Sequence, residues 1–194
     1  AVTWFHKAAE QGHAGAQFAL AVMYLEGKGA LQDYKQAVTW FRKAAEQGQV
    51  NAQLNLGNMY LTGDGVLPDY KQAETWFRKA AEQGNVDAQL SLGKMYLTGK
   101  GVLQDYKQAY MWVRKAAEQG HADSQFGLAL MYGAGKGVLR DYKQAYMWLN
   151  LARYNGANVE DGISRFDSEM TSKDILDAQE MSKRCLKSNY KECD

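Results

Sequence analysis

The chain alternates between amphipathic segments and loops that contain glycine. In the first complete segment the apolar residues follow the i, i+4, i+7, i+8 spacing of one helix face: Ala16, Leu20, Met23 and Tyr24. This spacing predicts a helix over residues 14–26. Gly27 is expected to end it, because glycine adopts the left-handed conformation of a helix C-terminus without steric cost.

A second amphipathic segment lies between Asp33 and Gly48. Its apolar face holds Ala37, Trp40, Phe41 and Ala44, and its polar face holds Lys35, Arg42, Lys43 and Glu46. Asp33 is predicted to cap this helix, and Gln36 is predicted to reach back to Asp33 in a capping box. The motif is therefore a pair of short helices, which we call helix A and helix B.

The motif recurs at a fixed interval. The stretch from Asp33 to Gly48 reads DYKQAVTWFRKAAEQG, and related stretches begin at Asp69, Asp105 and Asp141, so the period is 36 residues (69 − 33). A fixed period of this size is typical of a solenoid, in which each repeat buries its apolar face against its neighbours. We therefore expect an all-α fold with its function on an extended surface.

Small and aromatic residues share the predicted core. Ala52 and Gly57 let helices approach closely, while Trp40, Tyr60 and Tyr34 fill the spaces between repeats. We interpret these aromatic side chains as core and not as a ligand cage. Their polar atoms are expected to find hydrogen-bond partners.

Composition excludes several classes of function. Lys and Arg number 23 and Asp and Glu number 22, and neither sign forms a run, so the basic surface that nucleic-acid binding needs is absent from the sequence. No stretch of apolar residues is long enough to predict a membrane-spanning helix. The chain begins without Met and inside a repeat, so we expect its natural N-terminus to lie further upstream.

The repeat resembles a known family. The pattern Ala-x-Ala-Gln-x-x-Leu-Gly-x-Met-Tyr-x-x-Gly-x-Gly-Val-x-x-Asp-Tyr-x-Gln-Ala-x-x-Trp-x-x-Lys-Ala-Ala-Glu-Gln-Gly, seen from Asn51 to Gly84, is similar to the Sel-one-like repeat, a relative of the tetratricopeptide repeat. The resemblance implies a right-handed α/α superhelix with helix A on its concave side, and an adaptor role, often in bacteria. It covers a partial repeat at 1–12 and full repeats at about 13–48, 49–84, 85–120 and 121–156.

The repeat pattern fails after Gly156. An apolar stripe made of Val159, Ile163, Phe166 and Met170 is shifted by one residue from the repeat, and no Gly-x-Gly follows. Thr171 and Asp174 then predict a capping box that opens a last helix, with an inward face of Ile175, Ala178, Ser182 and Cys185. We interpret residues 157–194 as a helical cap, because a solenoid needs an atypical end that stops further stacking.

Comparison of the internal repeats identifies a candidate binding surface. The helix A residues that differ most between repeats fall on one face of the helix, opposite the packed face. The polar part of this stripe suits an extended peptide, because amides both donate to and accept from a main chain. The alternative is a solvated surface that is free to vary. The candidate residues are Asn51, Asn55, Asn58, Asp87, Ser91, Lys94 and Asp123.

Signals of catalysis or metal binding are weak. His6 takes the place of an arginine in other repeats, and His13 and His121 occupy equivalent positions three repeats apart, so they are not expected to share a metal. No catalytic or phosphate-binding motif occurs. We predict no catalytic residue, no metal and no cofactor.

Cys185 and Cys193 are the only cysteines. If the last helix breaks near residues 188–189, the tail can fold back and close a short disulfide, which implies an oxidising compartment. The alternative is a buried small side chain and a separate thiol. The paired ending resembles the tails of bacterial family members, which favours the disulfide.

The preferred interpretation is a non-catalytic adaptor that binds a protein or peptide on helix A, acts as a monomer and neither binds nucleic acid nor inserts into a membrane. One alternative is an immunity protein that neutralises a secreted effector enzyme. Another is a β-lactam-binding or hydrolysing enzyme, although the cysteine-rich relatives that suggest it carry a cysteine pair in each repeat, and this chain has none in its repeats. The expected compartment is the periplasm or the exterior, otherwise the cytoplasm.

Overall fold

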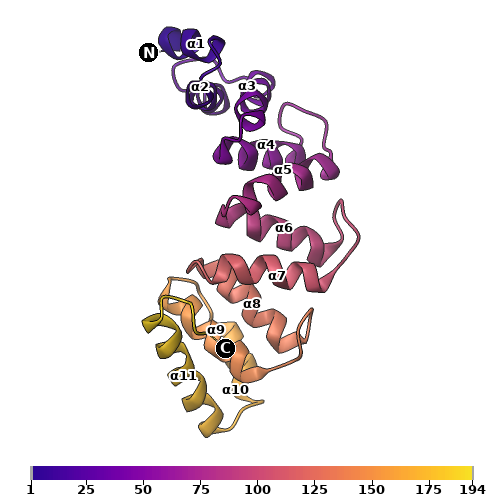
Figure 1. Ribbon diagram of the computed structural model, residues 1–194. Helices are drawn as coiled ribbons and strands as arrows, with labels where there is room; N and C mark the ends of the chain where they lie inside the picture. Colours follow the sequence, from indigo (N-terminus) through magenta and orange to yellow (C-terminus); the bar gives the residue numbers. More distant parts are fainter. Residues whose placement is uncertain (1, 194) are drawn as a thin grey trace. The chain divides into compact units, whose positions relative to one another are not determined.

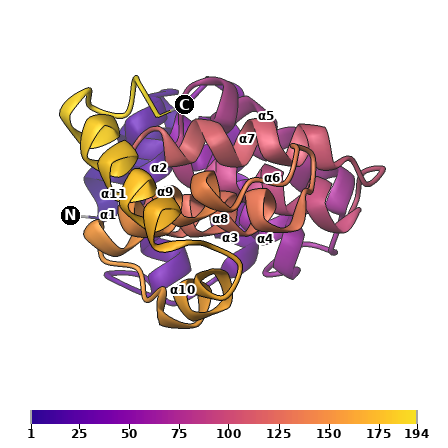
Figure 2. The ribbon, with the colours of Figure 1, turned by 90° about the horizontal axis from the view of Figure 1, so that it is seen from below.

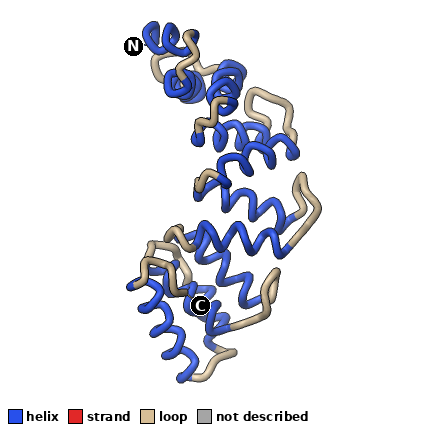
Figure 3. The backbone as a smooth tube through the Cα atoms, viewed as in Figure 1, coloured by secondary structure: helices blue, strands red, loops and turns tan. Residues whose placement is uncertain are grey.

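The computed structural model describes residues 2–193, apart from the side chains of residues 2, 3 and 167. Eleven helices and no strand occur in this part of the chain (Figures 1 and 3). In chain order they are α1 (Val2–Glu10), α2 (Ala14–Glu26), α3 (Tyr34–Glu46), α4 (Val50–Thr62), α5 (Tyr70–Glu82), α6 (Val86–Thr98), α7 (Tyr106–Ala117), α8 (Ala122–Ala134), α9 (Tyr142–Tyr154), α10 (Glu160–Asp167) and α11 (Ser172–Lys187). The predicted all-α fold of helix-turn-helix repeats is confirmed for these residues.

The chain forms two compact units, which we describe separately. The first comprises Ala1–Leu92 and Lys100–Leu103, and the second comprises Gly93–Gly99 and Gln104–Asp194. In the first unit α1 packs on α2, α2 on α3, α3 on α4 and α4 on α5 (Figure 1). In the second unit α7 packs on α8 and α8 on α9, and both α10 and α11 pack on α9. Helix α6 contributes residues to both units.

Each helix B begins at an aspartate cap. The Asp33 carboxylate accepts a hydrogen bond from the Gln36 backbone N–H at 3.0 Å, and Asp69, Asp105 and Asp141 make the equivalent bond. In a capping box the Gln36 side chain would accept a hydrogen bond from the Asp33 backbone N–H. That N–H donates instead to the Tyr24 carbonyl at 2.9 Å. The capping-box half of the prediction is therefore wrong, because helix A already supplies the acceptor.

In the second, third and fourth repeats, the second glycine of the Gly-x-Gly loop permits a close approach between this loop and a helix. Gly65 has φ = 72°, and a Cβ there would collide with the Tyr34 carbonyl at the start of α3. Gly137 has φ = 75°, and a Cβ there would likewise collide with the Tyr106 carbonyl at the start of α7. A side chain at either position would force the loop away from the preceding repeat.

A buried glutamine in each helix A links it to the helix B before it. The Gln53 side-chain Nε2 donates to the Ala45 carbonyl at 3.1 Å, and the Gln53 Oε1 accepts from the Gln83 Nε2 at 2.8 Å. Gln17, Gln89 and Gln125 donate to the equivalent carbonyls, those of Ala9, Ala81 and Ala117. These carbonyls lie at helix C-termini and also accept from the glycine N–H of the following turn, as Ala45 does from Gly48 at 3.0 Å, so each glutamine adds a second hydrogen bond there.

The tryptophans of the four full repeats are core residues, as predicted, whereas Trp4 of the partial repeat is exposed. Trp40, Trp76, Trp112 and Trp148 are between 1% and 7% exposed. Their indole N–H groups are buried and have no hydrogen-bond partner among the described residues, so the expected partners are absent there. Tyr60 and Tyr34 do have partners, because Arg42 and Gln32 donate to their hydroxyl groups. Tyr60 is buried, but Tyr34 is 40% exposed at the start of α3, so the prediction that Tyr34 is a core residue is wrong. The large apolar area of each indole ring outweighs the cost of about 1–3 kcal/mol for an unpaired N–H.

The C-terminal residues cover α9 (Figure 2). Helix α11 begins with the predicted capping box between Thr171 and Asp174 and buries Ala178, Ser182 and Cys185 against α9. Helix α10 ends at Asp167, so Met170 lies beyond it and the predicted apolar stripe does not continue on one helix. Of the predicted stripe, Val159 and Phe166 are buried, with side chains 1% and 3% exposed.

Candidate functional site

The candidate residues of α4 share one exposed face. Asn51 and Asn58 are exposed and Asn55 is half-buried. The Asn55 Nδ2 donates to the Asn51 carbonyl within the helix at 2.7 Å, which leaves the Asn55 Oδ1 as an acceptor. The Asn51 and Asn58 side chains make no hydrogen bond with another described residue, so both amides are available to a main chain in an extended partner.

The remaining candidates lie on the next two A helices. Asp87 and Lys94 are exposed and Ser91 is half-buried on α6, and Asp123 is exposed on α8. Lys94 and Asn58 are equivalent residues of consecutive repeats (94 − 58 = 36). The structure places all seven residues where a partner has access to them. That they bind one stays a prediction.

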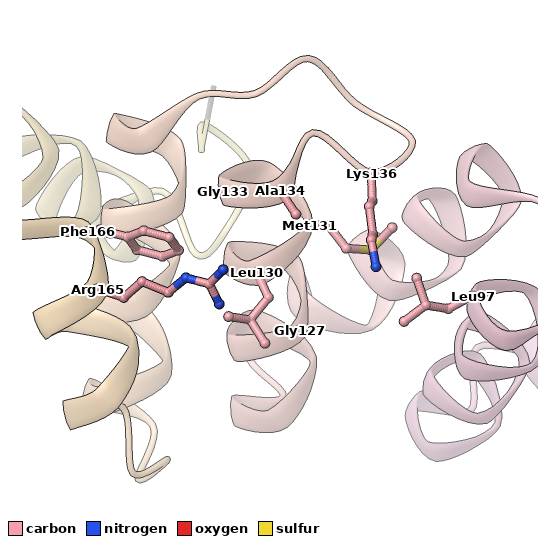
Figure 4. A pocket seen from close by; sticks show the side chains of 9 residues that line it. All are labelled: Leu97, Gly127, Leu130, Met131, Gly133, Ala134, Lys136, Arg165 and Phe166. Carbon is pink, nitrogen blue, oxygen red and sulfur yellow. The ribbon is translucent and has the colours of Figure 1, made fainter. Parts of the chain in front are cut away.

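The same face of α8 borders a cavity of about 340 Å³ that the sequence did not reveal (Figure 4). Its walls are mostly apolar and come from α6, α8 and α10, and two cationic side chains complete them. The lining residues are Leu97, Gly127, Leu130, Met131, Gly133, Ala134, Lys136, Arg165 and Phe166. The signal that marks it is Gly133, which stands where the earlier repeats have Leu25, Leu61 and Leu97.

The two cations approach the cavity from opposite sides. Lys136 extends from the loop after α8, and Arg165 extends from α10 towards Leu130 (Figure 4). No carboxylate among the described side chains pairs with either one. The Lys136 ammonium lies over the Tyr106 ring, 5.5 Å from the ring centroid. The cavity therefore combines apolar walls with a positive rim.

A disulfide anchors the C-terminal tail in the structure. Cys185 in α11 is bonded to Cys193, with Cα atoms 4.6 Å apart. The turn between them directs Tyr190 back to the end of α9, where the Asn155 Nδ2 donates to the Tyr190 hydroxyl at 2.8 Å. The same Nδ2 donates to the buried Gln125 Oε1 at 2.9 Å, so the tail completes the last glutamine link.

An ion pair joins α9 to the start of α11. The Lys143 ammonium lies 2.9 Å from Asp174 and 3.3 Å from Asp177. Hydrogen bonds from Thr171, followed by the Lys143 ammonium, lower the pKa of Asp174 to about 2. The two carboxylates in turn raise the pKa of Lys143.

The histidines have local roles. His6 contacts Glu10 at 3.2 Å and packs edge-on against Trp40, and the His121 ring accepts from the Ser124 N–H at the start of α8. His13 precedes α2 and makes no capping bond with its side chain. Within the described residues, no cluster of His, Cys, Asp and Glu forms a candidate metal site. None of the helices in this part of the chain has the length and apolar character to cross a membrane.

Comparison with known proteins gives a consistent result for the repeats. The Sel1 repeat family model matches residues 1–13, 14–49, 50–85, 86–121 and 122–156. A comparison with curated proteins finds no match. Residues after 156 lie outside the matched segments.

Two solved structures are similar over almost the whole chain. A protective antigen present in uropathogenic Escherichia coli strains, which displays an SLR fold, is 38% identical with a TM-score of 0.87 over 99% of this chain and 42% of its own. A Sel1 repeat protein from Oxalobacter formigenes is 34% identical with a TM-score of 0.82, over 94% of this chain and 77% of its own. The chain thus spans less than half of the E. coli antigen. From the repeated match and these likenesses, the chain belongs to the Sel1 repeat family.

Proposed function

We propose that this chain is a protein-binding module that holds an extended segment of a partner protein on its helix A face, without turnover. One observation carries the proposal. The packed positions of helix A are nearly the same in every repeat, whereas its exposed positions change from Asn58 to Lys94 to Leu130. A scaffold with constant packing and a variable exposed face suits a binding function, because each repeat can then contribute a different contact.

The chemistry of the face supports a peptide-like partner. The exposed amides of Asn51 and Asn58 both donate and accept, which matches the alternating N–H and C=O groups of an extended main chain. Asp87 and Lys94 bring charges of opposite sign to α6, which give a bound segment a preferred direction. We expect the chain to bind as a monomer.

The proposed compartment is the periplasm or the cell exterior. The disulfide between Cys185 and Cys193 supports it, since structural disulfides persist in oxidising compartments. The similar E. coli protein is a protective antigen, which is a second observation in favour of a location outside the cytoplasm.

The proposal is tested with a surface variant that changes the helix A face. Asn58→Arg combined with Lys94→Glu alters two equivalent exposed positions. Thr75→Arg combined with Lys107→Glu makes the same charge changes at exposed helix B positions and serves as the control. The three chains are used as bait for extract of the source bacterium, captured proteins are identified by mass spectrometry, and binding of the purified partner is measured by calorimetry.

We expect a partner that binds the unmodified chain and the helix B control but binds the helix A variant at least about tenfold more weakly. A purified partner that binds all three chains equally would refute the assignment of binding to helix A. If the helix B control alone loses the partner, the binding face is helix B.

A further inference from the structure

We propose that the cavity beside α8 is an anchor pocket for an apolar side chain that has carboxylates on either side of it in a partner segment. This inference rests on the proposed protein-binding function and adds the chemistry of the segment that is bound. It concerns residues of the second compact unit, none of which is among the seven sequence-predicted binding residues.

The pocket exists because the fourth repeat departs from the others at two glycines. Gly133 replaces a leucine, and the space is filled on one side by Phe166 of α10. Gly127 stands where the second and third repeats have Asn55 and Ser91. The change at Gly127 removes side-chain volume from the exposed face of α8 and leaves the cavity open, whereas the change at Gly133 makes room for Phe166, which forms part of the wall.

Helix packing does not require the glycine at position 127. A Cβ built there meets a single atom, a methyl carbon of Val113, at 3.6 Å, which is an ordinary contact. An alanine or serine would therefore fit at no steric cost, and what the glycine provides is open space in the pocket. At Gly57 and Gly93, by contrast, a Cβ would lie 2.7 Å from Phe77 and 2.6 Å from Val113, so those glycines serve packing.

The walls of the pocket are apolar where the second and third repeats are polar. Leu130 is 36% exposed and occupies the position of Asn58 and Lys94. Ala134 replaces Thr62 and Thr98 in the same way. Covering this apolar surface with another apolar group removes both from water, which is favourable, whereas a polar group would lose its hydration without a partner. The pocket therefore selects an apolar side chain.

The fourth repeat lacks the carboxylate that pairs with the equivalent lysine of the first repeat. In the first repeat Lys28 pairs with Glu26 at 2.8 Å. In the fourth repeat Lys136 is the equivalent of Lys28, but the residue that corresponds to Glu26 is Ala134. With Arg165 on the other side, two positive charges flank an apolar opening, and carboxylates in the occupant would complement both.

The volume of the pocket limits what it holds. About 340 Å³ is at the lower end of the range of ligand pockets, roughly 300–1,000 Å³. The space suits one anchoring side chain of an extended segment and not a folded element. The proposed motif is thus a single large apolar residue within an acidic sequence.

The test uses defined peptides and the full chain. The probe is a fluorescein-labelled peptide with a central Asp-Glu-Leu-Glu-Asp sequence between Gly-Ser ends. Matched peptides carry Ala in place of Leu, Asn and Gln in place of the acids, or Lys in place of the acids. Binding is followed by fluorescence anisotropy, and the site is located by methyl NMR of Leu97, Leu130 and Met131.

We expect saturable binding of the acidic leucine peptide, shifts at those methyl groups, and affinity lower by about tenfold for the Ala and the neutral peptides. Gly127→Leu fills the cavity and abolishes binding. Lys136→Glu combined with Arg165→Glu reverses the preference towards the Lys-flanked peptide, a change that a purely structural role would not produce. Lys100→Glu, the equivalent substitution one repeat earlier, leaves the preference unchanged.

Methyl NMR also verifies that each variant remains folded. The inference is overturned if the acidic leucine peptide gives no saturable shifts at millimolar concentration, or if the neutral peptide binds as well. Failure here is distinguishable from failure of the proposed function. A partner lost by the Asn58 and Lys94 variant but retained by the Lys136 and Arg165 variant would preserve the binding module and remove the anchor pocket from it.

Discussion

Phe166 of α10 occupies space that Gly133 of α8 leaves free. A Cβ on residue 133 would lie 2.5 Å from two ring carbons of Phe166, which is closer than real side chains approach. Because earlier repeats have leucine at this position, the glycine adapts the last repeat to receive the cap. The end of the solenoid is therefore encoded in the repeat itself as well as in the residues after it.

The first prediction concerns this contact. Gly133→Leu, which restores the repeat residue, should lower the free energy of unfolding by about 1–3 kcal/mol, because it overpacks a filled space. Phe166→Ala in the same chain should recover part of the loss. Urea denaturation measures both, with Gly127→Ala as a control that should not lower stability, because alanine fits there and favours the helix interior. A Gly133→Leu variant as stable as the parent chain would mean that Phe166 does not pack on α8.

A second prediction concerns the buried glutamines. Gln53→Leu removes the donor to the Ala45 carbonyl and the acceptor for Gln83. We expect a loss of about 1–3 kcal/mol in unfolding free energy, because both hydrogen bonds of the buried Gln53 side chain are lost. Chemical denaturation is again the measurement, and exposed Gln72→Leu on α5 is the control. Equal effects of the two substitutions would argue against the link.

A third prediction concerns the cap in acid. The pKa of Asp174, about 2, lies below its ordinary value of 3.8, so its contribution to stability is fully present above pH 4 and is lost as the pH falls towards 2. NMR titration of the Asp174 carboxyl group should show the low pKa directly. Thr171→Val and Lys143→Met should each raise it. A titration at the ordinary value in the parent chain would contradict the capping box and the ion pair.

A fourth prediction concerns the disulfide. Reduction opens a short loop with a sequence separation of 8, and chain entropy predicts a loss of about 2–3 kcal/mol in unfolding free energy. The Tyr190 ring should lose its fixed position beside Asn155, which its aromatic NMR signals report. A chain with both cysteines changed to serine should show the lower stability and no response to reductant. If reduction leaves stability and the Tyr190 signals unchanged, the bond does not anchor the tail.

The repeated part of the fold was predictable because local and periodic signals agree there. The apolar spacing around Leu20 and the glycine after it predicted the approximate extent of α2, and the Asp33 cap appears at the predicted residue. The glutamine link was missed, since Gln53 reads as a polar residue and only the packed structure shows that it is 3% exposed. Its burial depends on a carbonyl in the preceding helix, which a pattern of residue types does not contain.

The cap and its cavity were less predictable for a related reason. The apolar spacing from Val159 to Met170 suggested one stripe, but the helix stops at Asp167 and Met170 lies beyond it. The cavity forms only when α10 docks on α8, so neither Gly133 nor Arg165 indicates it alone. Comparison of the repeats identified the variable face of helix A. The position of the cavity on that face depends on the packing of α6, α8 and α10, which the sequence pattern does not contain.

The most direct measurement for the central claim is NMR of the complex between the chain and the partner that it captures. The side-chain amide signals of Asn51 and Asn58 report the helix A face, and the indole N–H signals of Trp40 and Trp76 report helix B in the same spectrum. The account predicts that the partner shifts the asparagine signals at saturation and leaves the indole signals in place. Shifted indole signals with unchanged asparagine signals would contradict it.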